Sequence, residues 1–141
     1  MTKDEILSKF FGGYRGGKFD ILDKEQLADK EFILDLYKRG ADINQLPLNK
    51  VSKELRADRE VVIAAVKQEP LQLKWAQKSL RGDKEVVMAV VSVYGSQLGD
   101  ASDSLRADKE VVLAAVENDS WALEYVDKSL QKDPDIIKAA E

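Results

Sequence analysis

The chain has 141 residues, of which 44% are hydrophobic and 34% charged, a balance that excludes collagen-like, mucin-like and wholly disordered proteins. With 22 Lys and Arg against 26 Asp and Glu, its net charge of −4 has the wrong sign for a general nucleic-acid binder. Cysteine and histidine are absent, which excludes disulfides, thiolate or imidazole zinc sites and Ser-His triads, so we expect one folded domain without a cofactor or metal.

The N-terminal segment, residues 1–28, is predicted to cap the rest of the domain. Thr2 and Glu5 have the spacing of a capping box, which predicts a first amphipathic helix at about residues 2 to 11. This acidic start is atypical of a signal peptide, and no apolar stretch approaches the roughly 18 residues of a membrane span. We therefore expect no membrane partner and a cytoplasmic protein, or an effector delivered elsewhere.

A glycine-rich loop, Gly12–Gly17, follows this helix. Together with Lys18 it matches the phosphate-binding pattern G-x-x-x-x-G-K. That pattern requires a preceding strand and a following Ser or Thr, whereas the preceding segment is predicted to be helical and the following residue is Phe19. We interpret the segment as a loop between capping helices and not as a nucleotide site.

A 25-residue repeat occupies most of the remaining chain. Three copies, residues 55–79, 80–104 and 105–129, each open with the pattern L-R-[AG]-D-[KR]-E-V-V. Residues 29–54 are a divergent earlier copy with four extra residues, and residues 130–141 begin a fourth copy. Because a fixed period marks one structural unit per copy, these boundaries define the expected organisation of the domain.

Each copy is predicted to begin with an α-helix. An aspartate in the opening pattern is a natural N-cap, and the glutamate two residues later complements the positive end of a helix. The same aspartates recur every 25 residues, but they lack the dense cluster of oxygen ligands that calcium requires. We therefore interpret them as N-caps and expect no metal; they are Asp58, Asp83, Asp108 and Asp133.

A second helix is predicted in each copy after a breaker such as Glu69-Pro70. Leu73, Ala76 and Leu80 follow at i, i+3 and i+7, the spacing of one helix face. One such helix pair cannot bury its own apolar faces, so neighbouring pairs must stack. The predicted fold is therefore all-α, a short α-solenoid of stacked two-helix hairpins.

The last segment, residues 130–141, is predicted to be a C-terminal capping helix. Asp133-Pro134 combines an N-cap with proline at the first helical position. Lys138 and Glu141 replace residues that are apolar in the three preceding copies. One face of this helix is therefore expected to be polar.

The opening pattern, extended to L-R-x-D-[KR]-E-V-V-x-A-[AV]-V, resembles the repeat of the family called domain of unknown function 4116. The likeness covers residues 55–141 well and residues 29–54 loosely. It implies a helical repeat and supplies no activity, ligand or site residue. The chain is also similar, as a second choice, to leucine-rich variant repeats, which are helical and of comparable length.

Charged residues suggest contacts between repeats as well as a binding surface. Arg56 and its equivalents stand four residues before Glu60 and its equivalents, which predicts salt bridges that help to set the register. Residues 92–127 contain eight acids against two bases, a local charge of −6, and we call them the acidic sector. Residues 67–84 contain five bases against two acids, a local charge of +3.

The copies differ most in their second helices, where a specific function is expected. Gly99 and Asp100 stand where the other copies have Lys74-Trp75 and Glu124-Tyr125, which indicates either drift or a functional surface. Tyr94 and Trp121 are candidate exposed anchors, because aromatic residues are frequent interface hot spots. The alternative is that Trp121 packs between hairpins, and Trp75 and Tyr125 are expected in the core. The candidate partner-binding residues are Tyr94, Asp100, Asp103, Asp119, Trp121 and Glu124.

These observations favour a non-enzymatic module that binds a protein partner with a basic surface through the second helices and the acidic sector. One alternative is a small inhibitor or immunity-type protein that occludes a basic active site or nucleic-acid groove. The other is an enzyme that uses carboxylates alone, such as Asp100 with Asp103 and magnesium, although the chain offers no phosphate cradle to complete such a site.

Overall fold

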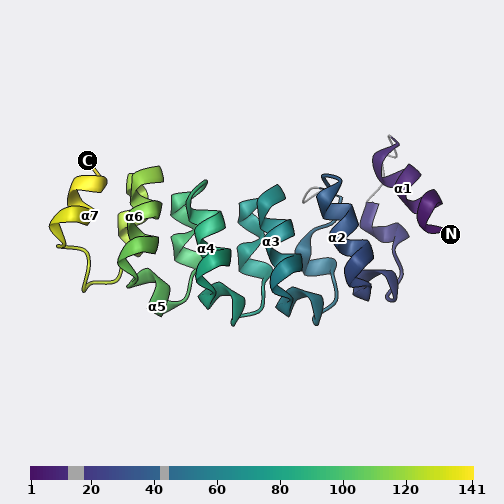
Figure 1. Ribbon diagram of the computed structural model, residues 1–141, viewed down its shortest axis with the longest axis horizontal. Helices are drawn as coiled ribbons and strands as arrows, with labels where there is room; N and C mark the ends of the chain where they lie inside the picture. The colour runs from purple at the N-terminus through teal and green to yellow at the C-terminus, as the bar shows by residue number, and fades with distance from the viewer. Residues whose placement is uncertain (13–17, 42–44) are drawn as a thin grey trace.

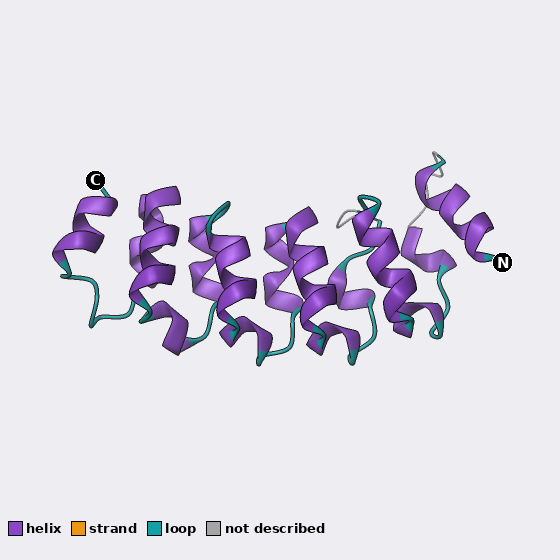
Figure 2. Ribbon diagram, viewed as in Figure 1, coloured by secondary structure: helices purple, strands orange, loops and turns teal. Residues whose placement is uncertain are grey.

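The computed structural model describes residues 1–12, 18–41 and 45–141, and every regular element in those residues is a helix (Figure 1). Figure 2 shows helices joined by short loops along the whole molecule. The chain is therefore all-α, as the repeats predict. Within the described ranges, no helix has the length and apolar character needed to cross a bilayer. The α-helices are α1 (Lys3–Phe11), α2 (Lys30–Lys38), α3 (Arg59–Gln68), α4 (Lys84–Val91), α5 (Asp103–Arg106), α6 (Lys109–Asn118) and α7 (Pro134–Ala139).

Local capping fixes where the α-helices begin, as predicted. In the three close repeats, the N-cap residues are Asp58, Asp83 and Asp108. The carboxylate of each accepts a hydrogen bond from the backbone N–H three residues later, with N–O distances of 3.1 to 3.2 Å. Asp133 caps α7, with Pro134 at the first helical position. Thr2 and Glu5 form the reciprocal capping box of α1. Helix starts are thus encoded by residues next to one another in the sequence.

The second element of each repeat is a short 3-10 helix, which corrects the prediction of one longer amphipathic helix. The chain becomes extended at Ala76, and Leu80 opens a separate 3-10 turn. Leu73, Ala76 and Leu80 are all buried, but they lie on two helices and the link between them. A six-residue stretch with apolar residues three apart suits a 3-10 helix, in which those side chains eclipse. The 3-10 helices are η1 (Lys18–Ile21), η2 (Gln26–Ala28), η3 (Leu48–Lys50), η4 (Leu55–Ala57), η5 (Pro70–Trp75), η6 (Leu80–Gly82), η7 (Gly95–Asp100) and η8 (Ser120–Tyr125).

The repeats lie in a row, and each contacts its neighbours along the sequence (Figure 1). The helices α2, α3, α4, α6 and α7 form one layer, in which each packs against the next. The helices η5, η7 and η8 form a second layer beside it. Between them lies a continuous core, because four positions of each repeat helix, such as Val61, Val62, Ala65 and Val66, are fully buried. This is the serial stacking of a solenoid.

A backbone hydrogen bond joins the start of each close copy to its end. The N–H groups of Gln77, Ser102 and Asp127 donate to the carbonyls of Arg56, Arg81 and Arg106 in the same copy, each at 2.9 Å. Ser52, near the end of the divergent copy, donates in the same way to Leu27, directly before that copy. These bonds hold the opening turn of each copy against its end, independently of side-chain identity.

A ladder of ion pairs also runs along the stack, but not between the predicted residues. The first residue of α2, α3, α4 and α6 pairs with the N-cap aspartate and the first-turn acid of the next helix in the same layer. Lys84, for example, lies 3.2 Å from Asp108 and 2.7 Å from Glu110. The predicted pairing of Arg56 with Glu60 is wrong, because the extended N-cap Asp58 separates them and they do not share a helix face. The other rungs are Lys30 with Asp58 and Glu60, Arg59 with Asp83 and Glu85, and Lys109 with Asp133 and Asp135.

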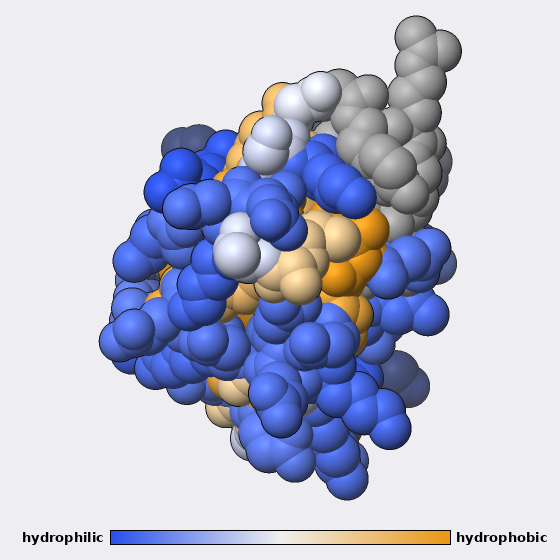
Figure 3. Space-filling view, turned by 90° about the vertical axis from the view of Figure 1, so that its right-hand side faces the viewer, coloured by the Kyte–Doolittle hydropathy of each residue, from blue (hydrophilic) through white to orange (hydrophobic). Residues whose placement is uncertain are grey.

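At the N-terminal end, α1 packs on the array through Ile6 and Phe10, which are fully buried. Its Lys3 pairs with Asp29 at 3.4 Å and so extends the ladder to α2. Viewed from this end, an apolar area lies near the centre of the visible face, with polar side chains to its left and below it (Figure 3). Phe11 in α1 is 42% exposed.

At the other end, α7 covers α6 with only part of its apolar surface. Ile136 is fully buried, and Lys138 and Glu141 are exposed, as the predicted polar face requires. Ile137 is 43% exposed, although its equivalents Val87 and Val112 are fully buried in the preceding repeats.

Candidate interaction surface

The layer of 3-10 helices carries most of the sequence variation between repeats and, among the described residues, most of the exposed aromatic side chains. Trp121 in η8 is 78% exposed, Tyr94 directly before η7 is 47% exposed, and Tyr125 at the end of η8 is 36% exposed. Since η7 and η8 are in contact, these residues lie on adjoining elements. We call Tyr94, Trp121 and Tyr125 the aromatic surface. The alternative that Trp121 packs between helix pairs is wrong.

A glycine in the preceding repeat positions the Tyr125 ring. A Cβ atom on Gly99 would lie only 3.0 Å from two carbons of that ring, so the ring packs directly on the glycine backbone. Tyr125 therefore lies over η7 instead of in the core, where it was expected. Trp75, its equivalent in the first repeat, is half-buried and packs against the core, with Lys74 Nζ 5.0 Å from its ring centroid.

The start of η7 depends on the repeat that follows it. Tyr94 occupies the N-cap position but supplies no side-chain cap, whereas Asp119 caps η8 by accepting from the Trp121 N–H at 3.0 Å. The Gly95 N–H instead donates to Asn118 Oδ1 at 2.7 Å. A Cβ on Gly95 would lie 2.1 Å from the Ala115 carbonyl oxygen, so α6 approaches η7 more closely than any side chain allows.

Only some of the charges in the acidic sector are available to a partner. Asp108 and Glu110 belong to the ladder, and Asp103 pairs with Arg106 at 2.5 Å. The side chains of Glu117 and Glu124 are exposed and make no hydrogen bond or ion pair with other described residues. Glu124 lines a hollow together with Trp121 and Lys132, so one of these two free carboxylates lies beside the aromatic surface.

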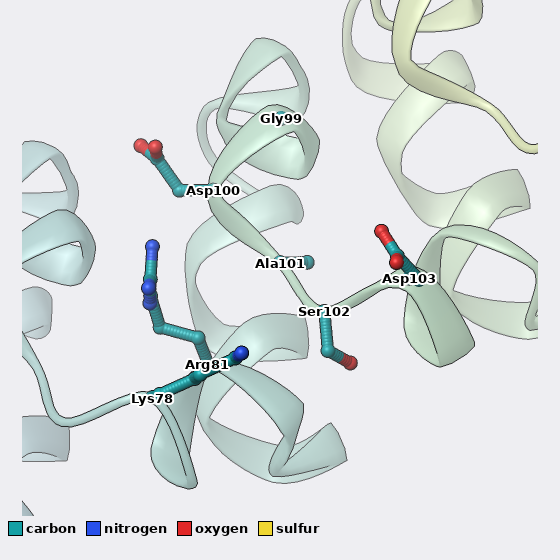
Figure 4. Close-up of a pocket in the computed structure, with 7 residues that line it drawn as sticks. All are labelled: Lys78, Arg81, Gly99, Asp100, Ala101, Ser102 and Asp103. Carbon is teal, nitrogen blue, oxygen red and sulfur yellow. The ribbon is translucent and has the colours of Figure 1, made fainter.

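A hollow of about 280 Å³ lies where the basic segment, residues 67–84, meets the acidic sector. It is lined by Lys78 and Arg81 from one side and by the backbone of η7 and its continuation to Ser102 from the other. Figure 4 shows the Arg81 guanidinium pointing toward the Asp100 carboxylate, with Asp103 on the far side of the same segment. Two predicted site residues, Asp100 and Asp103, thus share the hollow but point in different directions.

The guanidinium groups of the repeated arginines are only partly satisfied. In Arg56, Arg81 and Arg106 the Nε atom is buried and has no hydrogen-bond partner. Arg106 compensates through its terminal nitrogen, which donates to Asp103. Arg81 makes no side-chain hydrogen bond or ion pair with another described residue. It is therefore a cation without a partner at the edge of the hollow.

The arrangement of Asp100 and Asp103 offers little to the alternative of a carboxylate-only magnesium enzyme. Asp103 is engaged by Arg106, which leaves Asp100 without a second free carboxylate beside it. In the part of the chain that the structure describes, no three acidic side chains gather closely enough to hold a metal ion. The glycine-rich segment considered as a phosphate loop lies at residues 13–17, outside the described residues.

Sequence reasoning missed several residues of this surface. Leu71 and Val93 are 44% and 58% exposed beside the 3-10 layer, and Lys78 and Arg81 line the hollow. For Val93, an alignment of the repeats could have shown that this position is unusual, because valine stands there in place of the amide residues Gln68 and Asn118. Those amides bond to the C-terminal carbonyl groups of the preceding helix, and valine does not.

The sequence model of a family described as Domain of unknown function (DUF4116) matches the chain at residues 29–81, 83–131 and 108–140. These matches span the divergent copy, the three close copies and the C-terminal helix. No curated protein and no solved structure matches the chain.

Proposed function

The chain belongs to the family described as Domain of unknown function (DUF4116), and we propose that it is a non-enzymatic module that binds a protein partner through its 3-10 layer. The observation that carries the proposal is the exposure of Trp121, at 78% of its surface. A large aromatic side chain held in water is unfavourable, and such residues dominate binding energy when a partner covers them.

The charges around the aromatic surface indicate the kind of partner. Glu124 lines a hollow with Trp121 and forms no ion pair with a described residue, and the acidic sector around it has a charge of −6. A partner with a basic surface would be attracted to this end of the array, and the attraction would weaken as salt increases. Burial of the aromatic side chains would then supply most of the affinity.

Affinity capture with a matched pair of variants tests this proposal. The full chain is immobilised, and proteins retained from extract of the native cell are compared for the wild type, Trp121→Ala and Phe11→Ala. Phe11 is a suitable control because it is also exposed but lies in α1, at the other end of the array. The partner should be retained by the wild type and by Phe11→Ala, and lost with Trp121→Ala.

The purified partner then gives a quantitative test. Trp121→Ala, which truncates a central aromatic anchor, is expected to raise the dissociation constant about 30-fold. Phe11→Ala is expected to leave it unchanged. Equal binding by Trp121→Ala and the wild type, or a retained partner whose interacting surface is acidic, would overturn the proposal.

A further inference from the structure

The hollow beside η7 contains opposite charges that the fold leaves unpaired. Lys78, Arg81 and Asp100 line it, and none of these side chains makes a hydrogen bond or ion pair with another described residue. Elsewhere in the array, the cations at the helix starts pair with acids of the next repeat, and Arg106 pairs with Asp103. Unpaired charges of both signs therefore lie around this hollow.

Two lining residues of the hollow differ from their equivalents in the other repeats. Asp100 stands at the position of Trp75 and Tyr125, so a short acidic side chain replaces an aromatic ring where the Arg81 guanidinium points (Figure 4). Gly99 stands at the position of Lys74 and Glu124, and the Tyr125 ring fills the space that a side chain there would occupy. The second repeat therefore brings an acidic side chain and glycine backbone to the edge of the hollow.

The charges restrict what can occupy the hollow. A simple anion would be attracted by Lys78 and Arg81 but repelled by Asp100. A simple cation would be attracted by Asp100 but repelled by Lys78 and Arg81. A molecule that carries an ammonium group and carboxylates can satisfy all three side chains. The second lining acid, Asp103, is neutralised by Arg106. The unpaired lining charges, two cations and one acid, then leave a net charge of +1, which a molecule with two carboxylates and one ammonium group neutralises.

We propose that this hollow binds a free acidic α-amino acid. One or both carboxylates would lie against the Arg81 guanidinium, which is suited to two parallel hydrogen bonds, and the Lys78 ammonium group. The α-ammonium group would lie against Asp100. A volume of about 280 Å³ falls at the small end of ligand sites, which fits a molecule of this size. The site lies apart from Trp121 and does not depend on a protein partner.

Amide chemical shifts of the full chain provide the direct test. L-glutamate is added at constant ionic strength, and the N–H signals of Gly99, Ala101 and Ser102 are followed by NMR. Saturable shifts are expected, with a dissociation constant on the order of 1 mM or lower, since several charge-assisted contacts form. Glutarate, which has both carboxylates but no ammonium group, should bind about tenfold more weakly.

Variants assign the contacts. Arg81→Gln should abolish the response, whereas Arg56→Gln, the equivalent change one repeat earlier, should leave it intact. Asp100→Asn should remove the preference for L-glutamate over glutarate. Asp100→Tyr restores the aromatic residue of the other repeats and should block both molecules while the fold is kept, as unchanged signals from α6 would show.

Three results would overturn the inference. The first is the absence of saturable shifts at ten times the expected dissociation constant. The second is equal affinity for L-glutamate and glutarate, which would exclude a role for Asp100 in holding an ammonium group. The third is an equal effect of Arg81→Gln and Arg56→Gln, which would show that the response arises from general charge and not from the hollow.

Discussion

The helices η5 and η7 occupy equivalent places in consecutive repeats but are held in different ways. In η5, Glu69 accepts from the Leu71 N–H, Pro70 is buried at the first helical position, and Trp75 packs against the core. In η7, Tyr94 supplies no cap and the helix contains two glycines. The first helix is thus stabilised by its own sequence, and the second by the repeat that follows.

The same difference applies to a residue that both helices share. Gln72 is fully buried, accepts from the Leu48 N–H at 2.6 Å and donates to the Ala65 carbonyl at 3.2 Å. Gln97, its equivalent in η7, is half-buried and makes no such bond to a described residue. A repeat array therefore tolerates one repeat whose own sequence stabilises it weakly, because the neighbouring repeats supply the missing contacts. The residues of such a repeat can then serve a binding site.

The largest expected effect tests the dependence of η7 on its neighbour. In Gly95→Ala, the new Cβ would meet the Ala115 carbonyl oxygen at 2.1 Å and push α6 away from η7. We expect a loss of about 3 kcal/mol in the free energy of unfolding, measured by urea denaturation, because the clash is with backbone and not with a flexible side chain. Gly82→Ala is the matched control, because its nearest neighbours lie at 3.4 Å or more and the other repeats have Ala57 and Ala107 there. A similar loss in both variants would contradict this account.

A second pair of variants compares the two glutamines. Gln72→Ala leaves the buried Leu48 N–H without its acceptor, so we expect a loss of about 1 to 3 kcal/mol in the free energy of unfolding. Gln97→Ala should change it by less than about 0.5 kcal/mol, because no described partner is lost. Equal effects in urea denaturation would show that the two helices are held alike.

The smallest expected effect on the free energy of unfolding concerns the ion-pair ladder. The repeats that contain η5 and η7 both contribute to this ladder, so it should not distinguish them. Burial raises the pKa of Asp108, but hydrogen bonds from the Val111 N–H and Lys84 outweigh it and lower that pKa below its ordinary value. For Asp58, the Lys30 ammonium group and the Val61 N–H likewise outweigh the effect of burial on the pKa.

Because these pKa values are lower in the folded chain, the folded state binds fewer protons than the unfolded chain. Their stabilising contribution is complete above about pH 4 and is lost as pH falls through the folded values. We expect the urea midpoint to be insensitive to these groups between pH 5 and 7 and to fall below about pH 4. Asp108→Asn should make that fall smaller, and an unchanged slope would contradict the assignment.

The start of the first helix in each close repeat was predictable because its determinants are local. An aspartate followed by a charged pair and an apolar run specifies a capped helix whatever surrounds it, and Asp58, Asp83 and Asp108 all cap as predicted. The recurrence of that pattern at a fixed spacing also predicted that the helices would stack. The all-α fold and the membership of the repeat family follow from these same residues.

Contacts between repeats were harder to predict, because the period does not say which faces meet. Glu60 was assigned to Arg56, four residues away, but it pairs with Lys30 of the preceding copy. The sequence left both an exposed and a packed position open for Trp121, and η8 holds it in solvent. The pairing of Gly99 with Tyr125 and the hollow beside Arg81 also arise from residues of different repeats.

The sequence by itself thus determined the repeat, the helix starts and the serial stacking, since short-range capping and the need to bury apolar faces decide them. The tertiary structure alone decided the 3-10 form of the second helices, the partners in the ladder and the exposure of the aromatic surface. Those features depend on how closely one repeat approaches the next. Residues such as Gly95 and Asn118 change that distance without changing the 25-residue period of the sequence.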